Sequence, residues 1–209
     1  MVKILIADDH AVVRRGLKQI MTDEPDLLVV GEAQTAQQAL ELVRQQAWDV
    51  VVLDITMPGR SGLEVLKELQ RERPKLPVLV LSMHPEEQFA VRALKAGAAG
   101  YLTKESAPGE LVTAIRKVLG GGRYVSATLA ETLAFELAVA PDQSPHETLS
   151  NREYEVFRLL AAGKTVSEIA AQLFLSVKTI STYRARILEK MNLKHNAELI
   201  RYAVTRGLV

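Results

Sequence analysis

The chain has 209 residues, 48% of them hydrophobic and 24% charged, which is the composition of an ordinary globular protein and length enough for two small domains. It contains no cysteine, so disulfides, thiolate metal sites and cysteine catalysis are excluded. The net charge of +1 conceals a division: residues 1–125 carry 16 basic and 16 acidic side chains, residues 126–149 carry 0 and 4, and residues 150–209 carry 10 and 5. This division predicts a neutral domain, an acidic connector and a basic domain that meets a polyanion.

The apolar runs of the chain are short. None approaches the roughly 20 residues that cross a bilayer. The apolar start from Met1 to Ile6 is followed by Asp8, too early for the core of a signal peptide. We therefore expect a cytoplasmic protein without a membrane partner.

Residues 1–122 alternate short apolar runs with stretches of helical periodicity, five of each. The predicted strands run from Lys3 to Ala7, Leu27 to Val30, Asp49 to Asp54, Pro77 to Ser82 and Gly100 to Leu102. The predicted helices run from His10 to Met21, Ala36 to Val43, Gly62 to Leu69, Phe89 to Ala96 and Pro108 to Leu119. Gly31 is expected to break the second strand, and Val12 and Gly16 to share the inward side of the first helix with Leu17. Five βα units in this length predict an α/β fold, with a parallel sheet and helices on both faces.

Asp54 ends an apolar run and is followed by Met57-Pro58-Gly59, so it is placed at the carboxyl end of a strand buried on both faces. Its carboxylate either opens that turn or stands at the rim of the sheet, where open parallel sheets bind ligands. Other polar side chains at predicted strand ends are Asp8, Asp9, Ser82 and Lys104. Taken alone, Asp9 would be a helix N-cap and Lys104 a solvated loop residue. Their shared position favours a site at the rim.

Three carboxylates that converge on one rim repel one another and are costly to desolvate unless a cation neutralises them. Oxygen ligands with room for water favour Mg²⁺ over zinc. Beside Mg²⁺, Asp54 can attack a phosphoryl group, while Lys104 neutralises the charge gained and Ser82 donates a hydrogen bond. The pattern therefore predicts a magnesium-dependent site that accepts a phosphoryl group.

Residues 1–120 resemble a response-regulator receiver domain, which has the flavodoxin-like (βα)5 fold with a five-stranded parallel sheet. The resemblance rests on Asp8-Asp9, Asp54 with Met57-Pro58-Gly59, Ser82 and Thr103-Lys104. It implies that Asp54 is the phosphorylated residue. It also implies that Mg²⁺ is bound by Asp8, Asp9, Asp54 and the backbone carbonyl of Thr56.

The same resemblance implies a switch and a partner. Ser82 and Tyr101 match a hydroxyl and an aromatic side chain that change position together on phosphorylation, with Tyr101 moving inward. Considered alone, Tyr101 would be a half-buried aromatic residue of a strand. A receiver domain implies that a sensor histidine kinase supplies the phosphoryl group.

Residues 123–148 are predicted to link a receiver domain, residues 1–122, to a second domain, residues 149–209. Leu129, Leu133 and Leu137 have helical spacing, so part of the linker is expected to be helical. Residues 140–149 contain two prolines and few apolar side chains, which is typical of a flexible segment.

Residues 149–209 are predicted to form an all-α domain of four helices. Two capping boxes, Ser150 to Glu153 and Thr165 to Glu168, open the first two helices. Ser176 caps the third helix only a few residues after the second, which fits a helix-turn-helix. A fourth helix is expected from about Asn196 to Val204.

The third of these helices has two different sides. Its predicted core residues are Val177, Ile180, Ile187, Leu188 and Met191. The candidate DNA contacts are Lys178, Thr179, Thr182, Tyr183, Arg186 and Lys190. Hydroxyl side chains flanked by cations suit a helix in a major groove, with Lys190 assigned to phosphate. A solvated basic face is the alternative, which the place of this helix in a helix-turn-helix disfavours.

Residues 149–206 resemble the LuxR-type DNA-binding domain of NarL/FixJ-type regulators. The resemblance rests on Leu149-Ser150-Asn151-Arg152-Glu153, Ile169-Ala170, Leu175-Ser176, Lys178-Thr179-Ile180 and Lys190-Met191. Tyr183 departs from the pattern, in which a histidine is common. The last helix resembles the one through which such domains pair, which implies a homodimer on double-stranded DNA.

The two domains together predict a two-component response regulator, a phosphorylation-dependent transcriptional regulator rather than an enzyme. Phosphorylation of Asp54 is expected to promote dimerisation and promoter binding. One alternative is a regulator that binds DNA independently of phosphorylation. Another is an Mg²⁺-dependent phosphohydrolase, against which the Asp8-Asp9 spacing and the basic helix-turn-helix argue.

Overall fold

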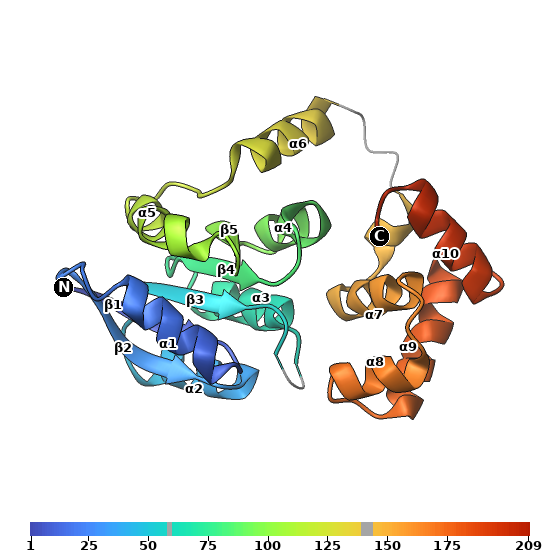
Figure 1. Cartoon of the computed structure of the whole chain (residues 1–209), viewed down its shortest axis with the longest axis horizontal. Coiled ribbons are helices and arrows are strands. Elements are labelled where there is room, and N and C mark those ends of the chain that lie inside the picture. The colour runs from blue at the N-terminus through green and yellow to red at the C-terminus, as the bar shows by residue number, and fades with distance from the viewer. Residues whose placement is uncertain (58–59, 139–143) are drawn as a thin grey trace. The chain divides into compact units, whose positions relative to one another are not determined.

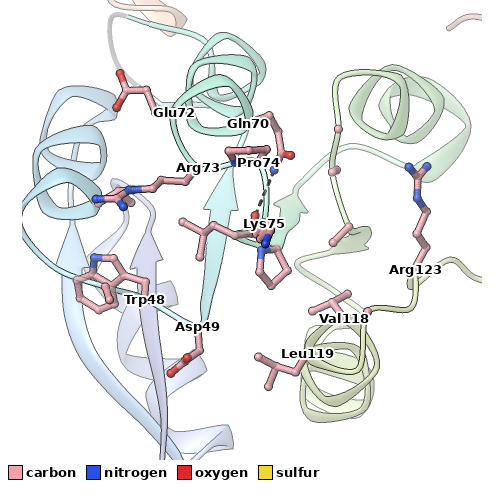
Figure 2. A pocket seen from close by; sticks show the side chains of 18 of the residues that line it. Trp48, Asp49, Gln70, Glu72, Arg73, Pro74, Lys75, Val118, Leu119 and Arg123 are labelled. Atoms are coloured by element: carbon pink, nitrogen blue, oxygen red, sulfur yellow. Dashed lines mark hydrogen bonds between the residues drawn. The ribbon is translucent and has the colours of Figure 1, made fainter.

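The computed structural model describes residues 1–57, 60–138 and 144–209. Pro58, Gly59 and residues 139–143, which include parts of the predicted turn and of the predicted flexible segment, lie outside the described residues. The chain divides into two compact units, Met1–Val139 and Ala140–Val209. Figure 1 shows the first unit in blue to yellow and the second in orange to red.

The first unit is built on a parallel sheet with the strand order β2-β1-β3-β4-β5 (Figure 1). The strands are β1 (Val2–Ala7), β2 (Leu27–Ala33), β3 (Val50–Asp54), β4 (Val78–Ser82) and β5 (Gly100–Thr103). Every residue of β3 and β4 is buried, which explains why these strands are continuous apolar runs rather than alternating ones. The predicted five-stranded parallel sheet is confirmed.

Five helices follow the five strands and cover both faces of the sheet. They are α1 (Ala11–Ile20), α2 (Ala36–Gln45), α3 (Gly62–Glu72), α4 (Glu86–Lys95) and α5 (Ala107–Leu119). The chain moves from β1 to β2 in one direction and from β2 through β5 in the other, so right-handed crossovers place α1 on the face opposite to α2, α3 and α4. α5 returns to α1 and packs with it over one core, which includes Ile4, Val52 and Leu81. The flavodoxin-like fold is confirmed.

Gly31 does not end the second strand, so that part of the prediction is wrong. β2 continues to Ala33, and its register against β1 shifts between Ile4, which faces Val29, and Leu5, which faces Gly31. A Cβ atom on Gly31 would lie 2.3 Å from Cη2 of Trp48. The glycine therefore makes room for the indole ring, which is 8% exposed.

The inward side of α1 also differs from the prediction. Val12 is 85% exposed and Gly16 is exposed, whereas Arg14 is buried. Leu17 is buried as predicted. Arg14 takes the inward position because it finds hydrogen-bond acceptors there, the backbone oxygen of Asp8 directly after β1 and the carboxylate of Glu32 on β2.

The start of the linker is helical and belongs to the first unit. α6 (Ala127–Ala138) packs against α4, and Leu129 is buried. The hydroxyl of Ser126 donates a hydrogen bond to Glu86, the first residue of α4. The part of the predicted linker that is described as α6 is thus anchored to the receiver sheet through α4.

The second unit is helical throughout its described part. A short 3-10 helix, η1 (Pro145–Thr148), precedes α7 (Asn151–Ala161), α8 (Val166–Gln172), α9 (Val177–Lys190) and α10 (Asn196–Thr205). Both predicted capping boxes are present, at Ser150 with Glu153 and at Thr165 with Glu168. Among the described residues, no helix combines the length and the apolar character needed to cross a bilayer.

The core of the second unit lies between α7, α8, α9 and α10. Its most buried side chains include Phe157, Ile169, Ile180 and Leu199. Val177, a predicted core residue and the first residue of α9, is instead 51% exposed, so that part of the prediction is wrong.

Gly62 offers a test of how tightly the fold closes on the end of β3. Its Cβ would lie 2.2 Å from the backbone oxygen of Asp54, so Gly62→Ala must displace the backbone. We expect Gly62→Ala to lower the free energy of unfolding by about 1–3 kcal/mol or more. In α1, a Cβ atom on Gly16 would have no neighbour within 4 Å, so Gly16→Ala should raise the free energy of unfolding by about 0.5–1 kcal/mol. Urea unfolding followed by the fluorescence of Trp48, the single tryptophan, measures both; equal effects of the two variants would contradict this account.

Candidate functional site

The strand ends bring four of the predicted site residues together. Asp54 and Ser82 are the last residues of β3 and β4, and Asp8 and Lys104 directly follow β1 and β5. Nζ of Lys104 lies 2.6 Å from Oδ2 of Asp54 and 2.6 Å from Oδ2 of Asp8. The side chains of both aspartates are 1% exposed and that of Lys104 is 7% exposed. One ammonium group therefore stands between two buried carboxylates.

Backbone amides hold the other oxygen of each carboxylate. The N–H of Thr56 donates to Oδ1 of Asp54 over 2.8 Å, and the N–H of His10 donates to Oδ1 of Asp8 over 2.8 Å. Such turns are what short acidic side chains form with the amide two residues further on. Asp54 thus opens a turn and faces the rim at the same time, so the two interpretations of the sequence do not exclude each other.

An acidic cluster surrounds Asp54. Ligand atoms of Asp8, Asp9, His10 and Asp54 all lie within 4.8 Å of one another. Oδ2 of Asp8 lies at ion-pair distance from Nζ of Lys104, and Oδ1 of Asp9 lies 2.8 Å from Nδ1 of His10. Among the described residues, neither oxygen accepts a hydrogen bond with good geometry. Buried carboxylate oxygens with unused lone pairs are a donor set that fits a hard divalent cation such as Mg²⁺.

The electrostatics of the site follow from its burial. Desolvation raises the pKa of Asp54 to about 6, against the opposing effect of Lys104. Burial also disfavours the charge of Lys104, but Asp54 and Asp8 outweigh it and hold the pKa of Lys104 above its ordinary value. At neutral pH the site thus holds a carboxylate that is costly to ionise beside a permanent cation.

Ser82 and Tyr101 meet at one residue, His84, of the loop between β4 and α4. The hydroxyl oxygen of Ser82 accepts from the N–H of His84 over 3.0 Å, and the hydroxyl of Tyr101 donates to the carbonyl of His84 over 2.9 Å. Both side chains are fully buried. Tyr101 is therefore not the half-buried strand aromatic of the alternative interpretation, and its ring already occupies the inward position.

The candidate DNA contacts lie along α9. Lys178, Thr182 and Arg186 are exposed, and Thr179 and Tyr183 are half-buried. Lys190 is exposed too, but its Nζ lies 2.6 Å from Oε2 of Glu153 in the capping box of α7.

Glu153 is 3% exposed, and burial alone would raise its pKa. Lys190 and the hydrogen bonds of Ser150 instead hold that pKa below its ordinary value. Lys190 thus has a structural partner, and its predicted phosphate contact stays a prediction.

Two family models match this chain. The response regulator receiver domain matches residues 4–116, and the LuxR family of bacterial regulatory proteins matches residues 147–203. The chain belongs to the two-component response regulators.

Similar response regulators span the whole chain. Response regulator UvrY of Escherichia coli K12 is 38% identical over 209 residues, covering 100% of this chain and 96% of that protein. Response regulator GacA of Pseudomonas aeruginosa is 41% identical over 211 residues, covering 100% and 98%. A structure of RcsB from Salmonella enterica serovar Typhimurium, bound to promoter rprA in the presence of phosphomimetic BeF3⁻, is 28% identical with a TM-score of 0.65 and covers 97% and 98%.

The sequence reasoning missed Arg14 in this response regulator. Its Nη1 donates to the backbone oxygen of Asp8 over 2.8 Å, and its Nε donates to Oε2 of Glu32 over 2.9 Å. Lys18 binds the other oxygen of Glu32 at 2.6 Å. Arg14 thereby fixes the chain at the acidic pair. Its spacing could have indicated this position, because a residue three before Leu17 lies on the same, inward side of α1.

The raised pKa of Asp54 predicts a pH dependence of stability. Between pH 4 and 6 the folded state keeps a proton on Asp54 that the unfolded state, with a pKa near 3.8, has lost. Stability from this group is therefore present below about pH 4 and is lost as the pH rises through about 6. We expect the stability of the wild type relative to Asp54→Asn, measured with chelator by urea unfolding of the Trp48 signal, to fall by on the order of 1–3 kcal/mol over this range. A difference independent of pH would refute this assignment.

Proposed function

We propose that this response regulator is switched by phosphorylation of Asp54, which a partner sensor histidine kinase carries out and which promotes dimerisation and promoter binding. The observation that supports the proposal most is the contact of one lysine, Lys104, with both Asp54 and Asp8 at the rim of the sheet. A buried carboxylate beside a fixed ammonium is a nucleophile whose phosphorylated product has a cation ready to bind it.

The chemistry follows from the charges. A carboxylate oxygen of Asp54 forms the bond to phosphorus while the bond from phosphorus to the imidazole nitrogen of the kinase breaks, and the electron pair stays on that nitrogen. Asp54 must be ionised to attack, which a pKa near 6 permits at neutral pH. Lys104 then neutralises part of the charge that the phosphoryl oxygens bring to the site.

Asp8, Asp9 and Asp54, with the carbonyl of Thr56, would hold Mg²⁺. The gathering of three carboxylates around the single ammonium of Lys104 supports this assignment. When bound, Mg²⁺ supplies positive charge against the phosphoryl oxygens. Arg14 keeps Asp8 in place for that role through its hydrogen bond to the Asp8 backbone.

The switch runs through His84. The hydroxyl of Ser82 keeps its proton while it accepts from the N–H of His84, so it can donate to a phosphoryl group on Asp54. Any shift of Ser82 acts on His84, the residue whose carbonyl accepts the hydrogen bond of Tyr101. Phosphorylation would thus favour the state with Tyr101 inward and change the β4–α4 surface, which is a population shift rather than a new conformation.

The output of the switch is DNA binding by the LuxR-type domain. α9 carries exposed Lys178, Thr182 and Arg186, and the RcsB relative is described on promoter DNA with a phosphomimetic. On α10, Val204 is 62% exposed and Ile200 is 36% exposed, which gives this helix an apolar side for pairing. Two linked domains bind two half-sites more tightly than one, so dimerisation alone raises affinity.

The direct test of this function compares wild type and Asp54→Asn with and without a small phosphodonor and Mg²⁺. In light scattering, we expect the phosphodonor to convert the wild type to a dimer, and on a duplex selected from a random pool we expect it to raise affinity about 10-fold or more. Asp54→Asn should respond in neither assay. Equal DNA binding by both proteins under all conditions would favour the phosphorylation-independent regulator.

The role of Arg14 is tested by Mg²⁺ affinity. Arg14→Met removes the hydrogen bond that fixes Asp8, so we expect the dissociation constant for Mg²⁺ in calorimetry to rise about 10-fold, as is typical when a residue that orients a ligand is lost. Lys18→Met is the matched control, because Lys18 shares Glu32 but does not contact Asp8. Equal Mg²⁺ affinity in the two folded variants would show that Arg14 serves stability alone.

A further inference from the structure

Six helices end in the same way. The residue two positions after the last helical one has a positive φ, the left-handed conformation that usually requires glycine or asparagine. These residues are Gly97, Gly121, Gly163, Phe174, Asn192 and Gly207. Among residues 1–57, 60–138 and 144–209, Phe174 is the one bulky side chain with a positive φ, at 53°.

The backbone around Phe174 is an ordinary helix end. The N–H of Leu175 donates to the carbonyl of Ala170 over 2.9 Å, as in the helix ends that normally place glycine at this position. Leu173 is buried and Leu175 is half-buried, so the neighbours of Phe174 anchor the turn. The turn therefore does not need an aromatic ring at residue 174.

The ring does not serve the core. Phe174 is 68% exposed, although aromatic rings usually stabilise a fold by being buried. Phe174 therefore destabilises the free protein in two ways, through its left-handed backbone conformation and through the exposure of its apolar ring. Strain of this kind is found where a residue has a task outside the fold.

The position of Phe174 indicates that task. It lies in the turn of the helix-turn-helix, two residues before Ser176, which caps α9. Val177, the first residue of α9, is 51% exposed, and the exposed Lys178 follows it. The N-terminal residues of a recognition helix are the ones that reach base edges, so this apolar pair continues the candidate DNA surface.

We propose that Phe174 and Val177 contact duplex DNA and read a thymine methyl group at the edge of the site that α9 occupies. The thymine methyl is the apolar group that the major groove offers to side chains such as phenylalanine. Residues 150–209 carry 10 basic and 5 acidic side chains, so the domain as a whole attracts a polyanion, and the exposed Lys178 lies next to Val177. The inference rests on the proposed placement of α9 in the major groove.

The test uses the full chain and a duplex selected by the wild type from a random pool. Phe174→Asn should melt at a higher temperature, because asparagine accepts this conformation, as Asn192 shows after α9. It should nevertheless bind the duplex about 3–10-fold more weakly. Replacing thymine by uracil, which lacks the methyl group, should weaken wild-type binding by a similar factor at one position at least, and should not affect Phe174→Asn there.

The inference is wrong if Phe174→Asn and Phe174→Gly bind the duplex as tightly as the wild type does. It is also wrong if uracil weakens binding equally in wild type and variant. Either result would indicate that the ring contacts a protein partner instead. Thr182→Ala separates this outcome from failure of the proposed DNA surface. If Thr182→Ala weakens binding and Phe174→Asn does not, only the role of Phe174 is wrong. If neither variant weakens binding, the placement of α9 is wrong as well.

Discussion

The contact of Lys104 with Asp8 and Asp54 is the interaction on which the rest of the receiver depends. The two carboxylates lie at the ends of separate strands, and both are buried. Each can therefore carry a negative charge at moderate cost only because the ammonium of Lys104 lies between them. Because the strands of the sheet are parallel, the carboxyl ends of β1, β3 and β5 lie at one edge and bring these three side chains together. The same arrangement sets three carboxylates, those of Asp8, Asp9 and Asp54, against one ammonium, which leaves the site with an excess of negative charge that a divalent cation would neutralise.

A short series of contacts connects this site to the surface of the first unit. Ser82 binds the N–H and Tyr101 binds the carbonyl of one residue, His84, just before α4, and α4 in turn packs against α6 at the start of the linker. Every contact along this route lies within the first unit. Under the proposed function, packed and hydrogen-bonded elements would carry a change at Asp54 to the segment that leads to the DNA-binding domain, and no long-range field would be required.

The sequence predicted the strands and the rim residues well because buried strands are continuous apolar runs and their ends are visible as the first polar residues. It failed where a side chain depends on a partner distant in the chain. Arg14 is inward because Glu32 lies on β2, and Lys190 is engaged because Glu153 lies on α7. Gly31 lies within β2 rather than at its end, and a side chain there would meet the ring of Trp48. Neither periodicity nor propensity encodes such contacts, and the left-handed backbone of Phe174 runs against propensity altogether.

The central claim is that Asp54 accepts a phosphoryl group. The most direct measurement is the intact mass of wild type and Asp54→Asn after incubation with a small phosphodonor and Mg²⁺, followed by peptide mapping of the modified chain. The account predicts a gain of one phosphoryl group in the wild type, mapped to the peptide that contains Asp54, and none in the variant. No gain in the wild type, or the same gain in both proteins, would contradict it.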